Sequence, residues 1–337
     1  MTRRLCALAT LLCVALGSGQ VFAQEESSSW SLAGLAFGDL YYLPSHHTEE
    51  GDGATGGVLR RGYLTLNWRP ESPWFGRARL ELNQSGEFET YDFELDFKDL
   101  HVGYKFENHQ LTVGLQPTLT FDEIESLWGL RHLMRTPADL QGFPSRDIGV
   151  SLKGRINDAW SYRLMNGIGE DFGAETGDGR KWMAAAKWQL NESWFMDFYT
   201  DYEELPGQSN RSTGQVFGGY QADNFRFGLQ YYYQDRQADI RAEFASAFAV
   251  KTLGNRFDLI GRIDRIFEPN PEGANISYIP FDPTARATLF LAALQYQVTE
   301  HLAIIPNTIV INYDRNDEGI IPETDFYLRL SFFLNYE

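Results

Sequence analysis

The chain has 337 residues, a formal net charge of −17 and a mean hydropathy of −0.35. Such acidity argues against nucleic acid as a partner, and no apolar run after residue 23 is long enough for a transmembrane helix. Aromatic residues make up 15% of the chain, which suits aromatic girdles at two lipid–water interfaces better than an acidic soluble enzyme.

Residues 1–23 have the layout of a secretory signal peptide, with a basic start, an apolar run over 5–16 and small residues before a cleavage point. Because this apolar run is too short to span a bilayer, we expect cleavage and export. Both cysteines, Cys6 and Cys13, lie in this segment. The remaining chain, 24–337, is therefore expected to fold without disulfide or thiol chemistry.

Short segments in which apolar and polar residues alternate recur along the chain, and helical periodicity is scarce outside one loop. Alternation with a period of two is typical of β-strands with one apolar face. The predicted strands are 30–42, 60–68, 75–83, 93–106, 110–116, 147–155, 160–167, 180–189, 194–202, 213–221, 225–234, 239–251, 257–266, 286–297, 302–312 and 324–336. In the last of these, Phe326, Leu328 and Leu330 share one face, and Asp325 and Arg329 share the other.

The connections between these strands alternate between long and short. The long ones are acidic or rich in Gly and Pro, such as "PSHHTEEGDGATGG", whereas the short ones are tight polar turns such as "RPES" and "LNES". Outer-membrane barrels have this pattern, with short periplasmic turns and longer extracellular loops. We therefore predict an all-β fold, a closed transmembrane antiparallel β-barrel of about 16 strands. A barrel of this size encloses an aqueous channel.

The connection 117–146, the third of the long loops, is the longest and contains the only helix-like stretch. Its residues Ile124, Leu127, Leu130 and Met134 fall at three- and four-residue spacing. A loop of this length is usually functional or disordered, and its apolar content argues against disorder. We expect it to fold into the barrel and narrow the pore.

Ionisable residues of this loop are expected to set the constriction: Asp122, Glu123, Glu125, Arg131, His132, Arg135 and Arg146. Opposite charges facing one another across a low-dielectric constriction would create a transverse field that orients and selects ions. The alternative is that the loop packs against the wall or a neighbouring protomer, with its charges solvated.

Strand parity places further charged residues inside the barrel. They are Arg61, Arg77, Arg79, Asp99, Arg163, Asp197, Arg226, Arg262 and Arg329. The basic members either guide solutes or offset the charge of acidic lumen residues, and the sequence leaves both readings open.

Three segments carry a resemblance to a known family: "LRRGYLTLNW", "LTVGLQPTLTFDE" and "SRDIGVSLKGRINDAWSYRLMNG". They resemble the phosphate-selective porin (O and P) family of bacterial outer-membrane channels. The local likeness covers about 55–170, and the layout covers most of the chain. The resemblance implies a 16-stranded barrel, commonly a homotrimer, with an inward-folded third loop and basic residues that guide anions. This chain departs from the family in its acidity and in its scattered lysines, so the resemblance supports a porin and does not support phosphate.

Catalytic and metal-binding motifs are missing from the sequence. The six histidines do not have metal-protease spacing, and neither a nucleophile elbow nor a P-loop occurs. We therefore expect no enzyme activity, no cofactor and no metal site. A hydrolase with dispersed residues such as His101 and Ser151 is the alternative. Acidic loops such as "HHTEEGDG" and "DRNDEG" could bind divalent cations or bridge lipopolysaccharide, but solvated loop charge accounts for them more simply.

The sequence thus favours a porin in the bacterial outer membrane through which small hydrophilic solutes or ions diffuse passively. Its expected partners are membrane lipid, lipopolysaccharide, the barrel assembly machinery and two further copies of the chain. A second hypothesis is a non-conducting barrel that serves as receptor, adhesin or anchor. The sequence leaves open the solute and the sign of ion selectivity.

Overall fold

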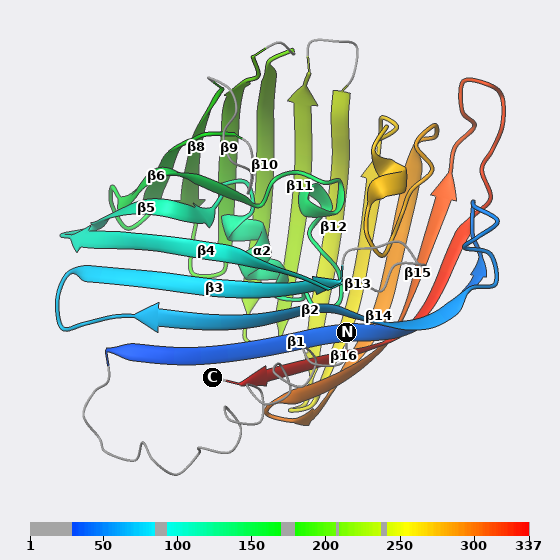
Figure 1. Ribbon diagram of the computed structural model, residues 1–337, viewed down its shortest axis with the longest axis horizontal. Helices are drawn as coiled ribbons and strands as arrows, with labels where there is room; N and C mark the ends of the chain where they lie inside the picture. Colours follow the sequence, from blue (N-terminus) through cyan, green and yellow to red (C-terminus); the bar gives the residue numbers. More distant parts are fainter. Residues whose placement is uncertain (1–28, 85–92, 170–178, 207–208, 237–240, 337) are drawn as a thin grey trace, which may run out of the picture.

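The computed structural model describes residues 29–84, 93–169, 179–206, 209–236 and 241–336. Within these ranges the strands form one closed antiparallel barrel in which each strand pairs with its neighbours in sequence and β1 pairs with β16 (Figure 1). The predicted signal segment 1–23 lies outside the described residues.

The described part of the chain has sixteen strands, two short α-helices and one 3₁₀ helix. These are β1 (Trp30–Ser45), β2 (Thr55–Trp68), β3 (Trp74–Gln84), β4 (Phe93–Phe106), β5 (His109–Pro117), α2 (Asp122–Trp128), α3 (Pro137–Leu140), β6 (Arg146–Arg155), β7 (Trp160–Gly167), β8 (Arg180–Gln189), β9 (Trp194–Glu204), β10 (Arg211–Ala222), β11 (Phe225–Asp235), β12 (Arg241–Leu253), β13 (Phe257–Ile266), η1 (Gly273–Asn275), β14 (Ala287–Thr299), β15 (Leu302–Tyr313) and β16 (Asp325–Tyr336). The prediction of a 16-stranded antiparallel barrel is confirmed. No described helix is long and apolar enough to cross a membrane.

The outer face of the barrel is apolar, as the alternation in the sequence predicts. In β16, Leu328 and Leu330 are exposed on the outside, whereas Asp325, Tyr327 and Ser331 point inward and are fully buried. The closing pair places Leu40 of β1 opposite Leu330. Large apolar side chains are exposed in this way around the barrel, which fits a wall that faces lipid.

Aromatic residues pair across neighbouring strands beside the short turns. The ring centroids of Trp160 and Trp188 lie 5.6 Å apart in a parallel stack, and those of Trp194 and Tyr220 lie 4.8 Å apart. Such rings at the ends of spanning strands form the girdle that sits at the membrane interface. The aromatic content of the sequence is explained in part by this belt.

The inner face is divided into a polar half and an apolar half. Strands β14 and β15 point Leu289, Leu291, Ile305 and Ile309 into the barrel, where they are fully buried. Strands β2 to β9 instead point charged residues inward, among them Arg61, Glu81, Asp99, Lys153, Arg163 and Asp197. A sheet section that is apolar on both faces must be covered on the inside by other protein.

Candidate functional site

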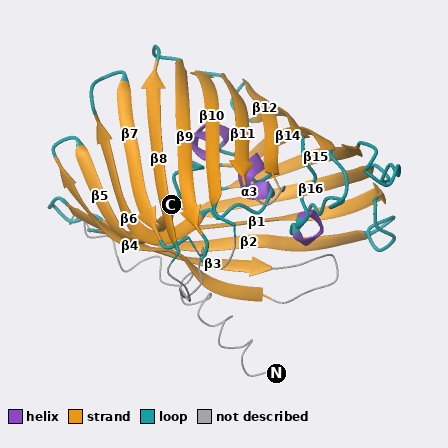
Figure 2. Cartoon of the chain, turned by 90° about the horizontal axis from the view of Figure 1, so that it is seen from above, coloured by secondary structure: helices purple, strands orange, loops and turns teal. Residues whose placement is uncertain are grey.

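The inward loop between β5 and β6 covers the apolar half of the barrel (Figure 2). Its first helix, α2, has Asp122, Glu123 and Glu125 in the first turn, where the helix dipole favours negative charge. Gly129 ends the helix in the left-handed conformation, with φ of 64°. One face of α2 is acidic, and the other face is apolar.

The apolar face of the loop docks on the apolar half of the barrel wall. Trp128 is 1% exposed, and its ring centroid lies 5.0 Å from that of Phe248 on β12. The guanidinium of Arg262 on β13 lies 5.2 Å from the same indole ring, and the indole N–H donates to the Met134 carbonyl at 2.8 Å. These contacts of Trp128 hold the loop against the wall at β12 and β13.

The acidic face of α2 points the other way, toward the polar half of the barrel. Glu123 accepts from Lys187 of β8 at 2.7 Å and from Arg163 of β7 at 2.9 Å. Asp122 accepts from Lys153 of β6 at 2.9 Å. Ion pairs thus link the loop to the wall opposite its apolar anchor, so α2 crosses part of the lumen.

A second group of charges gathers around Arg131, which follows α2. Arg131 donates to Glu125 at 2.9 Å and to Asp139 of α3. Burial favours the neutral form of Arg131, but Asp139 and Glu125 outweigh it and raise its pKa well above the ordinary value. Burial likewise opposes the ionised form of Asp139, but Arg131 and Arg135 lower its pKa. This pair is therefore charged over the whole physiological range.

Two predicted constriction residues are buried within the docked loop. His132 stacks on Phe333 with ring centroids 4.2 Å apart and lies 2.9 Å from the amide oxygen of Gln295, and burial lowers its pKa to about 4. Arg135 donates to the Ser277 carbonyl at 2.9 Å, and burial lowers its pKa to about 10. His132 is thus neutral and Arg135 is charged at pH 7.

A cluster of arginines surrounds one buried carboxylate on the polar wall. Asp99 of β4 is 0% exposed and accepts from Arg146 at 2.6 Å. The guanidiniums of Arg79 and Arg77 lie 3.4 Å and 3.9 Å from the same carboxylate. Three cations therefore surround one buried anion, which leaves positive charge to face the lumen.

The remaining predicted lumen residues point inward but differ in what they contact. Arg61 pairs with Glu81, and Arg163 pairs with Asp197. Arg226 donates to the Trp128 carbonyl at 3.3 Å. Arg262 and Arg329 are buried. Arg262 pairs with Asp264 of the same strand at 2.6 Å, and Arg329 donates to the Tyr278 carbonyl of loop 267–286.

Among these charges, five basic and three acidic side chains are partly exposed. Lys153, Arg77, Lys187, Arg79 and Arg131 retain 24–38% of their side-chain exposure. The acids that partner the wall arginines are buried, with 0–8% exposure for Asp99, Asp197, Glu81 and Asp139. The exceptions are the loop acids Asp122, Glu123 and Glu125, at 18–30%. At this level the solvent-facing charge is mainly basic, although the chain is acidic overall.

A second inward loop, 267–286 between β13 and β14, was missed by the sequence analysis. Its Ile279 and Phe281 are buried in the same apolar cluster as the first loop. The hydroxyl of Tyr278 lies 2.9 Å from the Arg60 carbonyl of β2 and 2.5 Å from the Gln84 carbonyl of β3, beyond the seam between β16 and β1. The run "ISYIPF" within a Gly- and Pro-rich connection was the available signal, because apolar residues in a long loop indicate docking.

The residues considered for a dispersed hydrolase have other partners. His101 Nδ1 lies 3.2 Å from the Leu115 carbonyl oxygen, and the Ser151 hydroxyl donates to the Gln116 side chain at 2.5 Å. Both contacts are ordinary wall hydrogen bonds between neighbouring strands.

Comparison with solved structures places this barrel among outer-membrane proteins. The anion-selective porin from Comamonas acidovorans matches with a TM-score of 0.64 at 13% identity, over 91% of this chain and 99% of that one. The outer membrane channel DcaP of Acinetobacter baumannii matches with a TM-score of 0.64 at 10% identity, over 94% of this chain and 100% of that one. The trimer form of OmpT, an outer membrane protein of Vibrio cholerae, matches with a TM-score of 0.59 at 11% identity, over 91% and 99%.

The fold is that of the outer-membrane porins. No family model matches the sequence, and no curated protein matches it. The resemblance to phosphate-selective porins therefore has no support at the level of the family, whereas the porin-type barrel is shown by the structure and its neighbours.

Proposed function

We propose that this protein is a narrow porin of the bacterial outer membrane through which small hydrophilic solutes or ions diffuse passively. The observation that carries the proposal is the division of the barrel interior into two halves. Loop 117–146 fills the apolar half, and the opposite wall presents partly exposed charged side chains. The proposed solute path runs along the polar wall past Arg77 and Arg79 of β3, because the acidic face of α2 itself contacts β6 to β8 through ion pairs.

The proposed path favours anions. Exposed arginine and lysine side chains create a positive potential along the path, and low-dielectric walls strengthen it. Lys153, Lys187 and Arg131 pair with the partly exposed acids Asp122, Glu123 and Glu125. Arg77 and Arg79 instead share the single buried Asp99 with Arg146, so these arginines carry the proposed preference. The proposal names no particular anion, because the resemblance supports a porin and not phosphate.

The proposed setting is that of a porin, with lipid and lipopolysaccharide around the barrel, insertion by the barrel assembly machinery and a homotrimer as the assembled form. The apolar outer wall and its aromatic belt support the membrane setting. The trimer form of the Vibrio cholerae neighbour supports the oligomeric state.

A non-conducting barrel is the second candidate, because the two inward loops meet. Arg135 of the first loop donates to Ser277 of the second at 2.9 Å, and Asn270 of the second donates to the Gln141 side chain of the first at 3.0 Å. Such contacts stabilise a narrow lumen. If they closed the lumen completely, the barrel would not conduct and would serve as a receptor or an anchor.

Conductance in a planar lipid bilayer separates the two candidates. The purified folded protein is expected to insert with discrete current steps, and the same preparation denatured by heat is expected to give none. Folding is checked beforehand by circular dichroism and by migration on a gel without heating. Absence of steps from protein that passes both checks would contradict the channel and favour the sealed barrel.

A further inference from the structure

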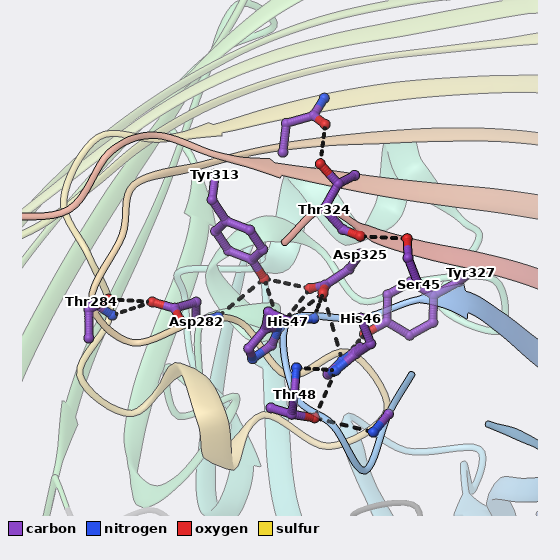
Figure 3. A network of polar contacts seen from close by, with 12 residues as sticks. Ser45, His46, His47, Thr48, Asp282, Thr284, Tyr313, Thr324, Asp325 and Tyr327 are labelled. Carbon is purple, nitrogen blue, oxygen red and sulfur yellow. Dashed lines mark hydrogen bonds and ion pairs between the residues drawn. The ribbon is translucent and has the colours of Figure 1, made fainter. Parts of the chain in front are cut away.

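Two neighbouring histidines and one aspartate meet where the barrel closes. His46 and His47 directly follow β1, and Asp325 is the first residue of β16, the strand that pairs with β1. His47 and Asp325 are 278 positions apart in sequence, yet the three side chains converge (Figure 3). All three side chains are buried, with 1%, 4% and 0% exposure.

The ligand atoms of this cluster are close enough to share one ion. His47 Nδ1 lies 2.9 Å from Asp325 Oδ1, and His46 Nε2 lies 4.0 Å from the same oxygen. One atom from each of the three residues falls within 4.8 Å of the other two. A tetrahedral metal with ligand bonds of about 2.0–2.1 Å separates its ligand atoms by about 3.3 Å. The two imidazole rings are stacked with centroids 4.4 Å apart, so the side chains must rotate to bring all three ligand atoms around a single centre.

Surrounding groups orient the three side chains. The Tyr313 hydroxyl donates to Asp325 Oδ2 at 2.5 Å, and His47 Nδ1 lies 2.9 Å from Oδ1 and 3.0 Å from Oδ2. His46 Nδ1 lies 2.9 Å from the Thr48 hydroxyl and accepts the Thr48 backbone N–H at 3.1 Å, and Nε2 lies 3.1 Å from the Tyr327 hydroxyl. An ion at Nε2 would displace the Tyr327 hydroxyl and needs the ring proton on Nδ1, where the Thr48 hydroxyl can accept it. Hydrogen-bonded partners of this kind fix the ring orientation and the tautomer of metal-binding histidines.

We propose that His46, His47 and Asp325 form a binding site for a first-row transition dication, with Zn²⁺ the best fit. Two imidazole nitrogens and one carboxylate oxygen are a donor set that suits Zn²⁺, Co²⁺ or Ni²⁺, whereas Mg²⁺ and Ca²⁺ prefer oxygen ligands alone. Three protein ligands leave the fourth position to water. The ion would tie the first long connection to the closing strand.

Binding requires a change of tautomer at His47. Without an ion, the ring N–H at Nδ1 donates to Asp325. Metal binding needs the lone pair of Nδ1, so the ring proton moves to Nε2 and the neutral imidazole keeps its single proton. The backbone N–H of His47 continues to donate to Asp325 Oδ1, at 2.7 Å, and holds the carboxylate in place.

The alternative account is a hydrogen-bond network that closes the rim without a metal. A titration of the untagged full chain, folded in detergent, with Co²⁺ separates the two accounts, because only the metal site predicts stoichiometric binding. We expect one equivalent to bind, with the visible absorption of tetrahedral Co²⁺, and Zn²⁺ to displace it.

Matched variants locate the site. Asp325→Asn keeps the size of the side chain and His47→Ala removes one imidazole, and each is expected to weaken Co²⁺ binding by more than about tenfold. Tyr313→Phe keeps every ligand and is expected to retain one equivalent. His301→Ala, at the turn end of the barrel, serves as the control because this exposed histidine is far from the cluster in the fold.

Thermal unfolding provides a readout that does not depend on the colour of Co²⁺. An ion that binds only the folded barrel raises the unfolding midpoint, so Zn²⁺ is expected to raise it in the wild type and not in Asp325→Asn. Absence of saturable binding in the wild type would overturn the proposal. Equal affinity in the wild type, Asp325→Asn and His47→Ala would also overturn it. Neither result would bear on conduction, because the site does not depend on the proposed channel.

Discussion

Replacement of Trp128 by alanine tests whether loop 117–146 sets the width of the lumen. The indole is 1% exposed, packs edge-on against Phe248 and donates to the Met134 carbonyl. Truncation of a buried tryptophan to alanine costs about 3–5 kcal/mol. Because 1.4 kcal/mol is a factor of ten, docking of the loop would weaken by roughly a hundred- to several-thousand-fold.

The expected result is a larger and noisier single-channel conductance in planar bilayers, since an undocked loop no longer fills the apolar half of the lumen. Trp182→Ala is the matched control, because Trp182 is 55% exposed on the outer wall and touches neither inward loop. The reasoning would be refuted if Trp128→Ala folded normally and conducted like the wild type, or if both variants changed conductance equally.

Three further predictions concern single contacts. His132 has its pKa lowered by burial to about 4 from 6.5, so the unfolded state binds more protons between these values. Stability is therefore expected to fall by about 3 kcal/mol as the pH drops from 6.5 to 4, and His132→Gln should flatten this dependence in urea unfolding. Tyr278→Phe loses the hydrogen bond to β3, which should cost about 1 kcal/mol and increase current noise; an unchanged noise spectrum would count against the second loop as a pore element. Gly114 has φ of 122°, and a Cβ there would strike the Leu100 carbonyl, so Gly114→Ala should lower the free energy of unfolding by about 1–3 kcal/mol in urea titration, whereas Gly261→Ala, with open space around it, should not.

The strands and their order could be predicted because each has one apolar face toward lipid. The period-two alternation in β16 and the short turns between strand pairs were enough to predict sixteen antiparallel strands. The inward position of loop 117–146 also followed from its apolar residues. Contacts that are local in sequence leave a local pattern, and this pattern can be read without a structure.

The asymmetry of the interior was harder to foresee, because a barrel of this size is expected to have a polar inner face. The stretches "ATLFLAAL" and "AIIPNTIVI" in β14 and β15 are nearly continuous apolar runs, which indicates strands buried on both faces. Reading these runs as covered by protein would also have predicted the docking of loop 267–286.

The cluster of His46, His47 and Asp325 could not be found from spacing. Metal motifs in sequence depend on ligands that lie close together on one element, whereas here the ligands meet because the barrel closes β1 against β16. The expectation that the chain has no metal site came from spacing alone, and the structure supplies the juxtaposition on which the new proposal rests.

The reversal potential under a KCl gradient tests the central claim most directly. We predict an anion-selective potential for the wild type and a shift toward zero for the variant Arg77→Gln/Arg79→Gln, which removes two cations that face the lumen. Arg265→Gln, which changes an outward-facing arginine paired with Asp314, should leave the potential unchanged. A cation-selective wild type, or a potential that does not respond to loss of Arg77 and Arg79, would contradict the account.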